Sequence, residues 1–324
     1  MIPLRDTIPT RNFPIVNTSI IGINALVFLI QIGQGNEFFR YIYTYGLIPV
    51  RYSLPQLASE YGGGHVYFAF VSFMFLHSGF WHLLGNMWSL YIFGDNVEDR
   101  LGPIRYLLFY LLCGMASGVS HLLLNLQSDI PIIGASGAIA GVMGAYFILH
   151  PKSKILTLIP IFFIPYFIEI PAYFFLGIWL VMQFVSAALS HGDISGIAWW
   201  AHIGGFVFGI IFLKLFLMLP QTGITRKVQK ATAKKKTHRL QVIRPVGTGT
   251  GQHMYATIEI TPYEARSGVR KLVNIPQGYH KRLFNVVVPP GVEQGTLLRL
   301  KGQGKSAHQT AERGDLFLKV AIKA

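Results

Sequence analysis

The chain of 324 residues is 52% hydrophobic and 13% charged, and its 28 Lys and Arg outnumber its 14 Asp and Glu. Soluble domains carry about 25% charged residues, so this composition excludes an ordinary water-soluble protein for most of the chain. The single cysteine, Cys113, excludes a disulfide within one chain, a cysteine-based zinc site and a thiol-relay enzyme.

Six apolar stretches are each long enough to cross a bilayer, which takes about 20 residues in a helix. Backbone groups in hydrocarbon must be paired internally, so we expect each stretch to be helical. The second is the weakest and could begin earlier, near Tyr67. The first expected span is not followed by the small-residue cleavage site of a signal peptide, so we expect it to be retained in the mature protein. The expected spans are 15–33, 80–95, 104–125, 132–149, 170–190 and 196–219.

Basic residues predict the orientation, because loops on the cytoplasmic side carry an excess of Lys and Arg. An even number of spans places both termini on one side. The opposite side would carry only Arg40 and Arg51, so we expect both termini in the cytoplasm of a bacterial-type inner or cell membrane. The basic residues on the cytoplasmic side would be Arg5, Arg11, Arg100, Arg105, Lys152, Lys154 and those of the C-terminal tail.

The composition changes near Gln221, because the 19 Lys and Arg and 5 Asp and Glu beyond residue 220 supply the whole net charge of +14. We expect residues 1–220 to form the membrane domain, 221–249 a basic cytoplasmic linker and 250–324 a separate domain. The linker is either a solvated spacer or a contact for anionic lipid headgroups, worth about 1 kcal/mol per basic residue. It lacks the interleaved aromatic residues typical of nucleic-acid binding, so no nucleic acid is expected.

Short runs beyond the linker alternate apolar and polar residues, which predicts strands. Turn sequences such as Pro289-Pro290-Gly291 separate these runs. The pattern predicts a small soluble β domain whose strands lie at 257–260, 271–275, 283–288, 297–300 and 316–320.

Polar residues inside a membrane are costly, so each is a candidate functional residue. His82 and Asn86 are four residues apart, which places them on one face of one helix. Two further clusters are Gly134-Ala135-Ser136-Gly137 in the fourth span and Ala201-His202-Ile203-Gly204-Gly205 in the sixth.

The predicted topology brings these clusters to a similar shallow depth below the outer surface. Ser136 would lie about four residues, or about 6 Å, into its span, and His202 about six residues into a span of the same direction. Small residues at every fourth position, including Gly137 and Gly205, would let the two helices approach closely. We therefore expect Ser136 to lie within hydrogen-bond reach of His202.

A serine next to a base can act as a nucleophile, since the base takes its proton. His82, Asn86 and the backbone N–H of Ser136 would then stabilise the oxyanion. Each feature also has a structural explanation, because a membrane serine often bonds a backbone carbonyl, His82 and Asn86 could form an interhelical bond, and adjacent glycines often serve packing.

Other residues rank lower as catalytic groups. His77, at the mouth of the second span, is expected to have a structural or substrate-positioning role. No second cluster of ligands accompanies the histidines, so neither a metal nor another cofactor is expected. Asp193 is a candidate to orient His202, but a dyad without an acid is favoured.

The motifs His82-x-x-x-Asn86, Gly134-x-Ser136-Gly137 and Ala201-His202-x-Gly204-Gly205 resemble those of the rhomboid intramembrane serine proteases. The resemblance covers about residues 10–218 and implies a six-helix core. It also implies that Ser136 is the nucleophile and His202 the base. The family cleaves transmembrane protein substrates near their outer ends in the lipid bilayer and needs no metal or nucleotide.

The tail, from Val287-Val288-Pro289-Pro290-Gly291 to Gly302-x-Gly304, is similar to the C-terminal client-binding domain of DnaJ-type co-chaperones. It lacks the His-Pro-Asp signature of a J domain and the cysteine-rich zinc module, so stimulation of a chaperone ATPase is not implied. The resemblance implies an apolar peptide client, taken up by strand addition. A domain kept only for fold stability or membrane attachment is equally consistent with these residues.

We therefore expect an all-α polytopic membrane protein with a small C-terminal all-β domain, acting as a serine endopeptidase. The alternative is a catalytically silent rhomboid-like protein that binds and escorts membrane segments, although such relatives typically lose the serine or the histidine. A transporter or channel would require several buried carboxylates along a path. Substrate entry is expected at the fifth span, near Phe174, Phe175 and Trp179, and the loop at 197–200 is expected to cover the site.

Overall fold

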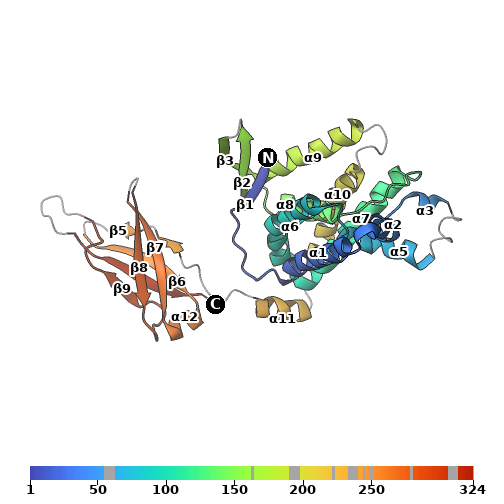
Figure 1. Cartoon of the computed structure of the whole chain (residues 1–324). Helices are drawn as coiled ribbons and strands as arrows, with labels where there is room; N and C mark the ends of the chain where they lie inside the picture. Colours follow the sequence, from blue (N-terminus) through green and yellow to red (C-terminus); the bar gives the residue numbers. More distant parts are fainter. Residues whose placement is uncertain are drawn as a thin grey trace. The chain divides into compact units, whose positions relative to one another are not determined.

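The computed structural model divides the chain into two compact units, Met1–Ala233 and Lys234–Ala324 (Figure 1). The structure describes all residues except 55–62, 162–163, 190–197, 221–222, 233–239, 244, 248–251, 278–279, 306–312 and 324. The first unit is mainly helical and the second mainly β, as the sequence predicts.

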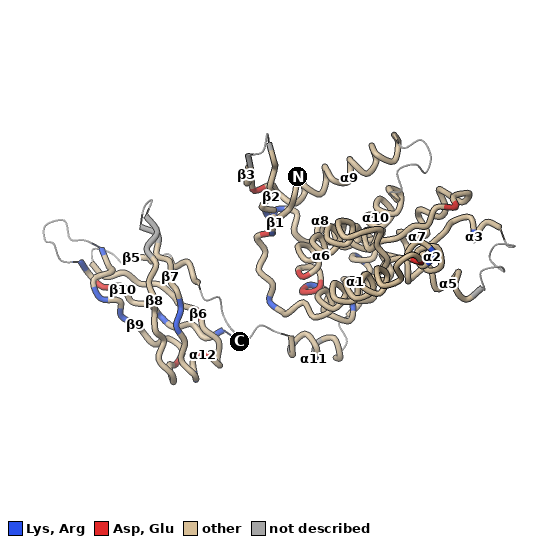
Figure 2. The backbone as a smooth tube through the Cα atoms, in the orientation of Figure 1, with Lys and Arg blue, Asp and Glu red and all other residues tan. Residues whose placement is uncertain are grey.

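Six long apolar helices make up most of the first unit. Their charged residues are confined to the stretch from Asp95 to Arg100, to Arg105 and to Lys214, so most of each helix is uncharged (Figure 2). The helices are α1 (Ile15–Gly33), α6 (Phe80–Leu101), α7 (Pro103–Leu124), α8 (Ser136–Leu149), α9 (Ala172–Leu189) and α10 (Trp199–Met218).

Four of these helices, α1, α7, α9 and α10, are each long and apolar enough to cross a membrane. Helix α6 meets the same test together with the preceding helical stretch, from which it is bent by 76°. Helix α8 is a shorter apolar helix of 14 residues. The length and apolar character of these helices confirm the prediction of a polytopic membrane fold.

The segment between α1 and α6 contains short helices that the sequence pattern did not predict. The 76° bend between residues 64–75 and 80–101 is that of a broken span or a re-entrant loop, so the expectation that the second span could begin near Tyr67 stays a prediction. The short elements are η1 (Gly35–Glu37), α2 (Phe38–Tyr45), α3 (Val50–Ser53), α5 (Gly63–Ser72) and η2 (Phe73–Phe75).

Helix α8 begins at Ser136, four residues later than the predicted span. The preceding Gly134 has a φ of +119°, a backbone conformation that is incompatible with a helix and open mainly to glycine. Ser136 is therefore the first residue of its helix, and the expectation that it lies four residues inside is wrong.

The first unit also contains a small antiparallel sheet, of order β1-β2-β3, that the sequence analysis did not predict. It joins β1 (Ile2–Asp6) to the hairpin of β2 (Lys154–Ile161) and β3 (Ile164–Pro171). The Tyr146 hydroxyl and the Asn96 amide donate to the Asp6 carboxylate at 2.6 and 2.8 Å, which ties β1 to α8 and α6. Burial raises the pKa of Asp6 despite these donors.

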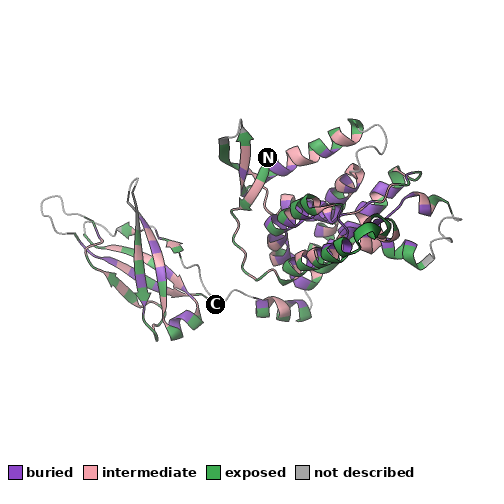
Figure 3. Cartoon of the chain, viewed as in Figure 1, coloured by how far each residue is buried: buried purple, intermediate pink, exposed green. Residues whose placement is uncertain are grey.

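Helix α8 lies at the centre of the core, because every residue from Gly137 to Tyr146 is buried. Its glycines and alanines let the neighbouring helices pack against its backbone. Helix α9 is different, since many of its side chains are exposed or half-buried (Figure 3). Such a surface is typical of a helix that faces lipid on most sides.

The segment expected as a linker, 221–249, contains α11 (Gly223–Thr232) and the strands β4 (Leu240–Val242) and β5 (Val246–Gly247). Helix α11 belongs to the first unit, where the Gln229 amide donates to the Asp99 carbonyl at 3.1 Å and the Thr232 carbonyl accepts from the Phe13 N–H at 2.9 Å. Lys234, Lys235 and Lys236 lie outside the described residues.

Two sheets build the second unit, and all five predicted strands are present in it. One has the order β5-β6-β10-β9, in which the central strands β6 and β10 are parallel, and the other has the order β4-β7-β8. Their inward residues, such as Ile258, Val273 and Val320, form a shared core. The remaining bounds are β6 (Met254–Ile260), β7 (Val269–Gln277), β8 (His280–Val288), β9 (Leu297–Leu300) and β10 (Leu316–Ile322).

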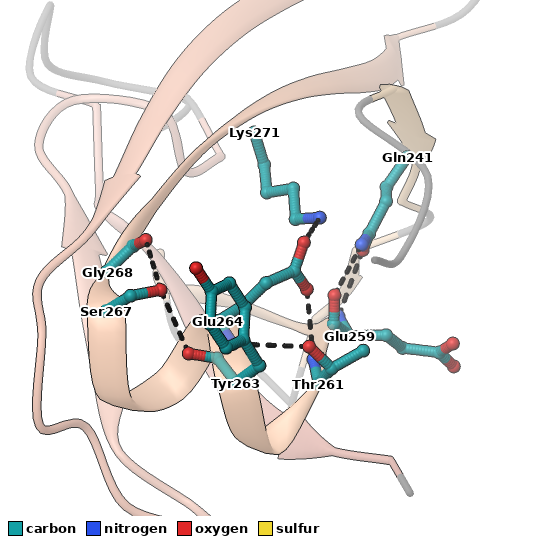
Figure 4. A network of polar contacts seen from close by, with 8 residues as sticks. All are labelled: Gln241, Glu259, Thr261, Tyr263, Glu264, Ser267, Gly268 and Lys271. Carbon is teal, nitrogen blue, oxygen red and sulfur yellow. Dashed lines mark hydrogen bonds and ion pairs between the residues drawn. The ribbon is translucent and has the colours of Figure 1, made fainter. Parts of the chain in front are cut away.

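A buried ion pair stabilises the start of α12 (Pro262–Ser267) between β6 and β7 (Figure 4). Thr261 and Glu264 form a capping box, and the second oxygen of the Glu264 carboxylate lies 2.6 Å from the Lys271 amine. Both charged side chains are almost completely buried, at 3% and 2% exposure. Burial of both charges is tolerated because each is paired with the other.

Candidate functional site

The predicted site residues come together around the first turn of α8. Ser136 begins this helix, and the Gly134 N–H donates to the Phe73 carbonyl at 2.8 Å, which fixes the segment that leads into it. The positive φ of Gly134 prevents the helix from beginning earlier, so the Ser136 side chain lies at the N-terminal end of α8. Ser136 is half-buried.

His202 lies in the first turn of α10, and its Nε2 is 2.8 Å from the Ser136 Oγ. The two helices approach to backbone contact at glycines. A Cβ on Gly205 would lie 2.1 Å from the Gly137 carbonyl oxygen, and one on Gly209 would lie 2.2 Å from the Gly141 carbonyl oxygen. The glycines therefore permit the approach that brings the hydroxyl and the imidazole together.

Gln183 of α9 completes a chain of hydrogen bonds that the sequence analysis missed. Its Oε1 lies 2.7 Å from the Nδ1 of His202, and the residue is 6% exposed. The pattern gave no spacing motif for this residue. Its one signal is that it places an amide within an otherwise apolar span, where polar groups are costly.

His82, near the start of α6, faces the same region. Its Nδ1 accepts from the Ser78 backbone N–H at 3.3 Å and lies 3.0 Å from the Ser78 Oγ. A backbone N–H can only donate, so the Nδ1 carries no proton and the neutral ring holds its proton on Nε2. His82 therefore presents an N–H donor from its Nε2.

The His82 ring lies against Gly134, next to Ser136. A Cβ on Gly134 would be 2.8 Å from the His82 Nε2 and 3.7 Å from the Ser136 Oγ. The absence of a side chain at Gly134 therefore permits the His82 ring to lie this close to the start of α8.

Asn86 lies one turn after His82 on α6, as its spacing predicts. Its amide donates to the His82 carbonyl at 2.9 Å, a bond within the helix. His77 is fully buried, and its ring packs against the His82 ring with a centroid distance of 5.1 Å. The Gln31 amide holds the His77 backbone through bonds at 2.7 and 3.1 Å, so His77 supports the wall of the site.

Two tryptophans flank the His202 ring. Trp179 of α9 lies 6.0 Å from it and Trp199 of α10 lies 6.1 Å from it, centroid to centroid. Phe175 is buried and contacts Phe93, whereas Phe174 is 53% exposed. Asp193 and residue 197 lie outside the described residues.

The described residues contain no group of three or more His, Cys, Asp or Glu arranged to hold a metal ion. The polar groups that converge here are the Ser136 hydroxyl, the imidazoles of His82 and His202, and the Gln183 amide. Such a set can transfer a proton between the hydroxyl and an imidazole and can donate hydrogen bonds to a developing negative charge.

Comparison with known proteins agrees with this fold. A family model of the rhomboid domain matches residues 64–219, and a model of the DnaJ C terminal domain matches residues 222–324. The chain therefore contains a rhomboid domain followed by a DnaJ C-terminal domain, and it is a rhomboid-like intramembrane protein.

Similar proteins come from a plant, a fungus and a bacterium. RHOMBOID-like protein 6, mitochondrial, of Arabidopsis thaliana is 32% identical over 160 residues, which are 47% of this chain and 45% of the relative. Rhomboid protein 1, mitochondrial, of Saccharomyces cerevisiae is 26% identical over 232 residues, which are 69% of this chain and 56% of the relative. Putative rhomboid protease YdcA of Bacillus subtilis is 39% identical over 71 residues, which are 22% of this chain and 35% of the relative. The chain thus spans about half the length of the first two relatives.

Proposed function

We propose that the chain is an intramembrane serine endopeptidase that cleaves transmembrane protein substrates through Ser136 and His202. The observation that carries the proposal is the 2.8 Å distance between the Ser136 Oγ and the His202 Nε2 inside a rhomboid domain. A serine hydroxyl needs such a base to become a nucleophile at neutral pH.

In the proposed reaction, the Ser136 Oγ attacks the carbonyl carbon of the scissile peptide bond while its proton passes to the His202 Nε2. The oxyanion of the tetrahedral intermediate accepts a hydrogen bond from the His82 Nε2–H, which lies against Gly134 beside Ser136. Rotation of the Asn86 amide away from the His82 carbonyl would supply a second donor.

His202 then returns its proton to the leaving amine as the C–N bond breaks, which leaves an acyl-enzyme on Ser136. Water gives a proton to His202 and attacks the ester carbonyl, and the Ser136 oxygen regains a proton as the acid product departs. We propose that this water enters from the outer surface and that both termini lie in the cytoplasm, because the basic residues gather on the terminal side.

The test is cleavage of a labelled transmembrane substrate by the purified full chain in liposomes. Wild type and the control Ser89→Ala should cleave the substrate, since Ser89 bonds the Gly85 carbonyl on α6 and is exposed. Ser136→Ala and His202→Ala should not cleave it. Cleavage by Ser136→Ala at the wild-type rate would overturn the proposal in favour of a protein that only binds and escorts membrane segments.

For the second unit we propose binding of an apolar peptide segment by strand addition at β8. β8 is an edge strand of its sheet in the described structure, and Leu283 and Val287 on it are 59% and 58% exposed. Removal of residues 234–324 should leave the peptidase activity of the purified protein largely intact and alter which substrates are cut in cells. Complete loss of activity in a folded truncated protein would show that the second unit belongs to the catalytic unit.

A further inference from the structure

The C-terminal half of α9 carries one buried polar residue, Gln183. From Val181 to Leu189, Gln183 is the one residue that is buried, and its neighbours Met182 and Phe184 are 54% and 47% exposed. An amide in such a helix is costly unless it is paired, so its partners decide what it does.

Both ends of the Gln183 amide are paired, and the pairing fixes its orientation. The Nε2 donates to the Trp179 carbonyl at 3.2 Å, and a carbonyl oxygen can only accept. The atom that faces the His202 Nδ1 at 2.7 Å is therefore the Oε1, which can also only accept. The Nδ1 of His202 must then carry a proton.

A protonated Nδ1 in a neutral imidazole leaves the Nε2 with a free lone pair. This is the nitrogen that lies 2.8 Å from the Ser136 Oγ. The hydroxyl thus donates to the Nε2, which is the arrangement that a general base requires. In proteases whose third residue is an amide, the amide oxygen holds the histidine in the same way.

We propose that Gln183 is a positioning residue that holds His202 in the tautomer able to accept the Ser136 proton, an inference that rests on the proposed peptidase function. Three helices then contribute to one chain of hydrogen bonds: α8 gives the hydroxyl, α10 the imidazole and α9 the amide. The dyad expected from the sequence becomes a serine, histidine and glutamine triad, with no acid required.

The experiment compares Gln183→Leu, Gln183→Glu and the control Met182→Leu in the full chain in detergent. In wild type, ¹⁵N NMR of labelled histidine, with the His202 signal identified by its loss in His202→Ala, should show a protonated Nδ1. Gln183→Leu should give a mixture of tautomers and a fall in kcat of about 10-fold or more with little change in KM, because the Nδ1–H loses its acceptor. Met182→Leu should match wild type.

Gln183→Glu separates positioning from packing. A carboxylate oxygen can accept from the Nδ1–H, so activity should return above that of Gln183→Leu. The acid limb of its pH profile should move by about 1 pH unit to higher pH, because a negative charge favours the protonated imidazole. This shift remains measurable even if Gln183→Leu fails to fold.

Two results would overturn the inference. One is a Gln183→Leu variant with the wild-type tautomer and kcat, and the other is a Gln183→Glu variant with the wild-type pH profile. In both cases Ser136→Ala, measured in parallel, would still abolish cleavage if the proposed function holds. Cleavage by Ser136→Ala would instead refute the proposed function itself.

Discussion

Gly205 of α10 lies so close to Gly137 of α8 that a Cβ at Gly205 would be 2.1 Å from the Gly137 carbonyl oxygen. Gly209 repeats this relationship one turn later, with a Cβ at 2.2 Å from the Gly141 carbonyl oxygen. The contact is between two backbones, so neither side can give way by moving a side chain. The alignment of Ser136 with His202 depends on it.

We predict that Gly205→Ala separates α8 from α10. Overpacking of this kind typically costs about 1–3 kcal/mol, and the separation should also abolish the reactivity of Ser136. The measurements are thermal unfolding in detergent and cleavage of the labelled substrate. Gly177→Ala in α9 is the control, because nothing lies within 4 Å of a Cβ at Gly177. Equal behaviour of the two variants would contradict the proposed role of Gly205.

We predict that Gly134→Ala lowers kcat by about 100-fold or more, which is typical of losing an oxyanion donor. The methyl group would lie 2.8 Å from the His82 Nε2 and displace that ring, and the φ of +119° is unfavourable for alanine. Gly79→Ala is the control, since its φ of 173° suits any residue and its Cβ would meet nothing within 4 Å. A Gly134→Ala variant as active as Gly79→Ala would show that catalysis does not require the His82 ring to lie against Gly134.

In the second unit we predict that Lys271→Met destabilises the fold by about 3 kcal/mol or more, because it leaves the Glu264 carboxylate buried without its cation. Hydrogen exchange of β6, β7 and β8 in the full chain measures this loss. Lys323→Met, which removes an ion pair with Glu259 whose side chains are 62% and 47% exposed, should cost at most about 1 kcal/mol. Equal losses of stability in the two variants would contradict the prediction that the buried Lys271–Glu264 pair matters more than the exposed one.

The second unit should also lose stability in acid through Asp315. The Gly302 N–H, at 2.7 Å, and the Arg299 side chain, at 2.6 Å, hold the pKa of Asp315 below its usual value. A carboxyl with a lowered pKa in the folded state stabilises the fold above the usual carboxyl pKa, and this contribution is lost as the pH falls.

Exchange protection of β9 and β10 should therefore stay constant near neutral pH and fall as the pH drops below about 4, the ordinary carboxyl pKa. Asp315→Asn should be less protected at neutral pH and should show a smaller further loss in acid. A variant with the same acid dependence as wild type would show that other carboxyls are responsible.

Much of the fold can be predicted from the sequence because its signals are local. A charge-free stretch of about 20 residues predicts a membrane helix, and the alternation around Ile258 and Val286 predicts strands wherever the partner strands lie. The start of α8 is different, because nothing in the pattern shows that Gly134 adopts a positive φ. The predicted helix therefore begins four residues too early, at 132 instead of Ser136.

The small sheet and Gln183 depend on tertiary structure. Strand β1 pairs with β2 about 150 residues away, with Ile2 opposite Leu158, and no local pattern encodes that pairing. Gln183 has no spacing partner in its own helix, and its role follows only once α9 packs beside His202. Ser136, His202 and His82 could be predicted because each stands in a short polar motif within an apolar span.

The most direct test of the central claim is labelling of the full chain with a fluorophosphonate probe, followed by mass mapping of the adduct. A serine activated by His202 should carry the adduct on Ser136 in wild type, and His202→Ala should remove the labelling. An adduct on another serine, or labelling of Ser136 that is unchanged in His202→Ala, would contradict the account.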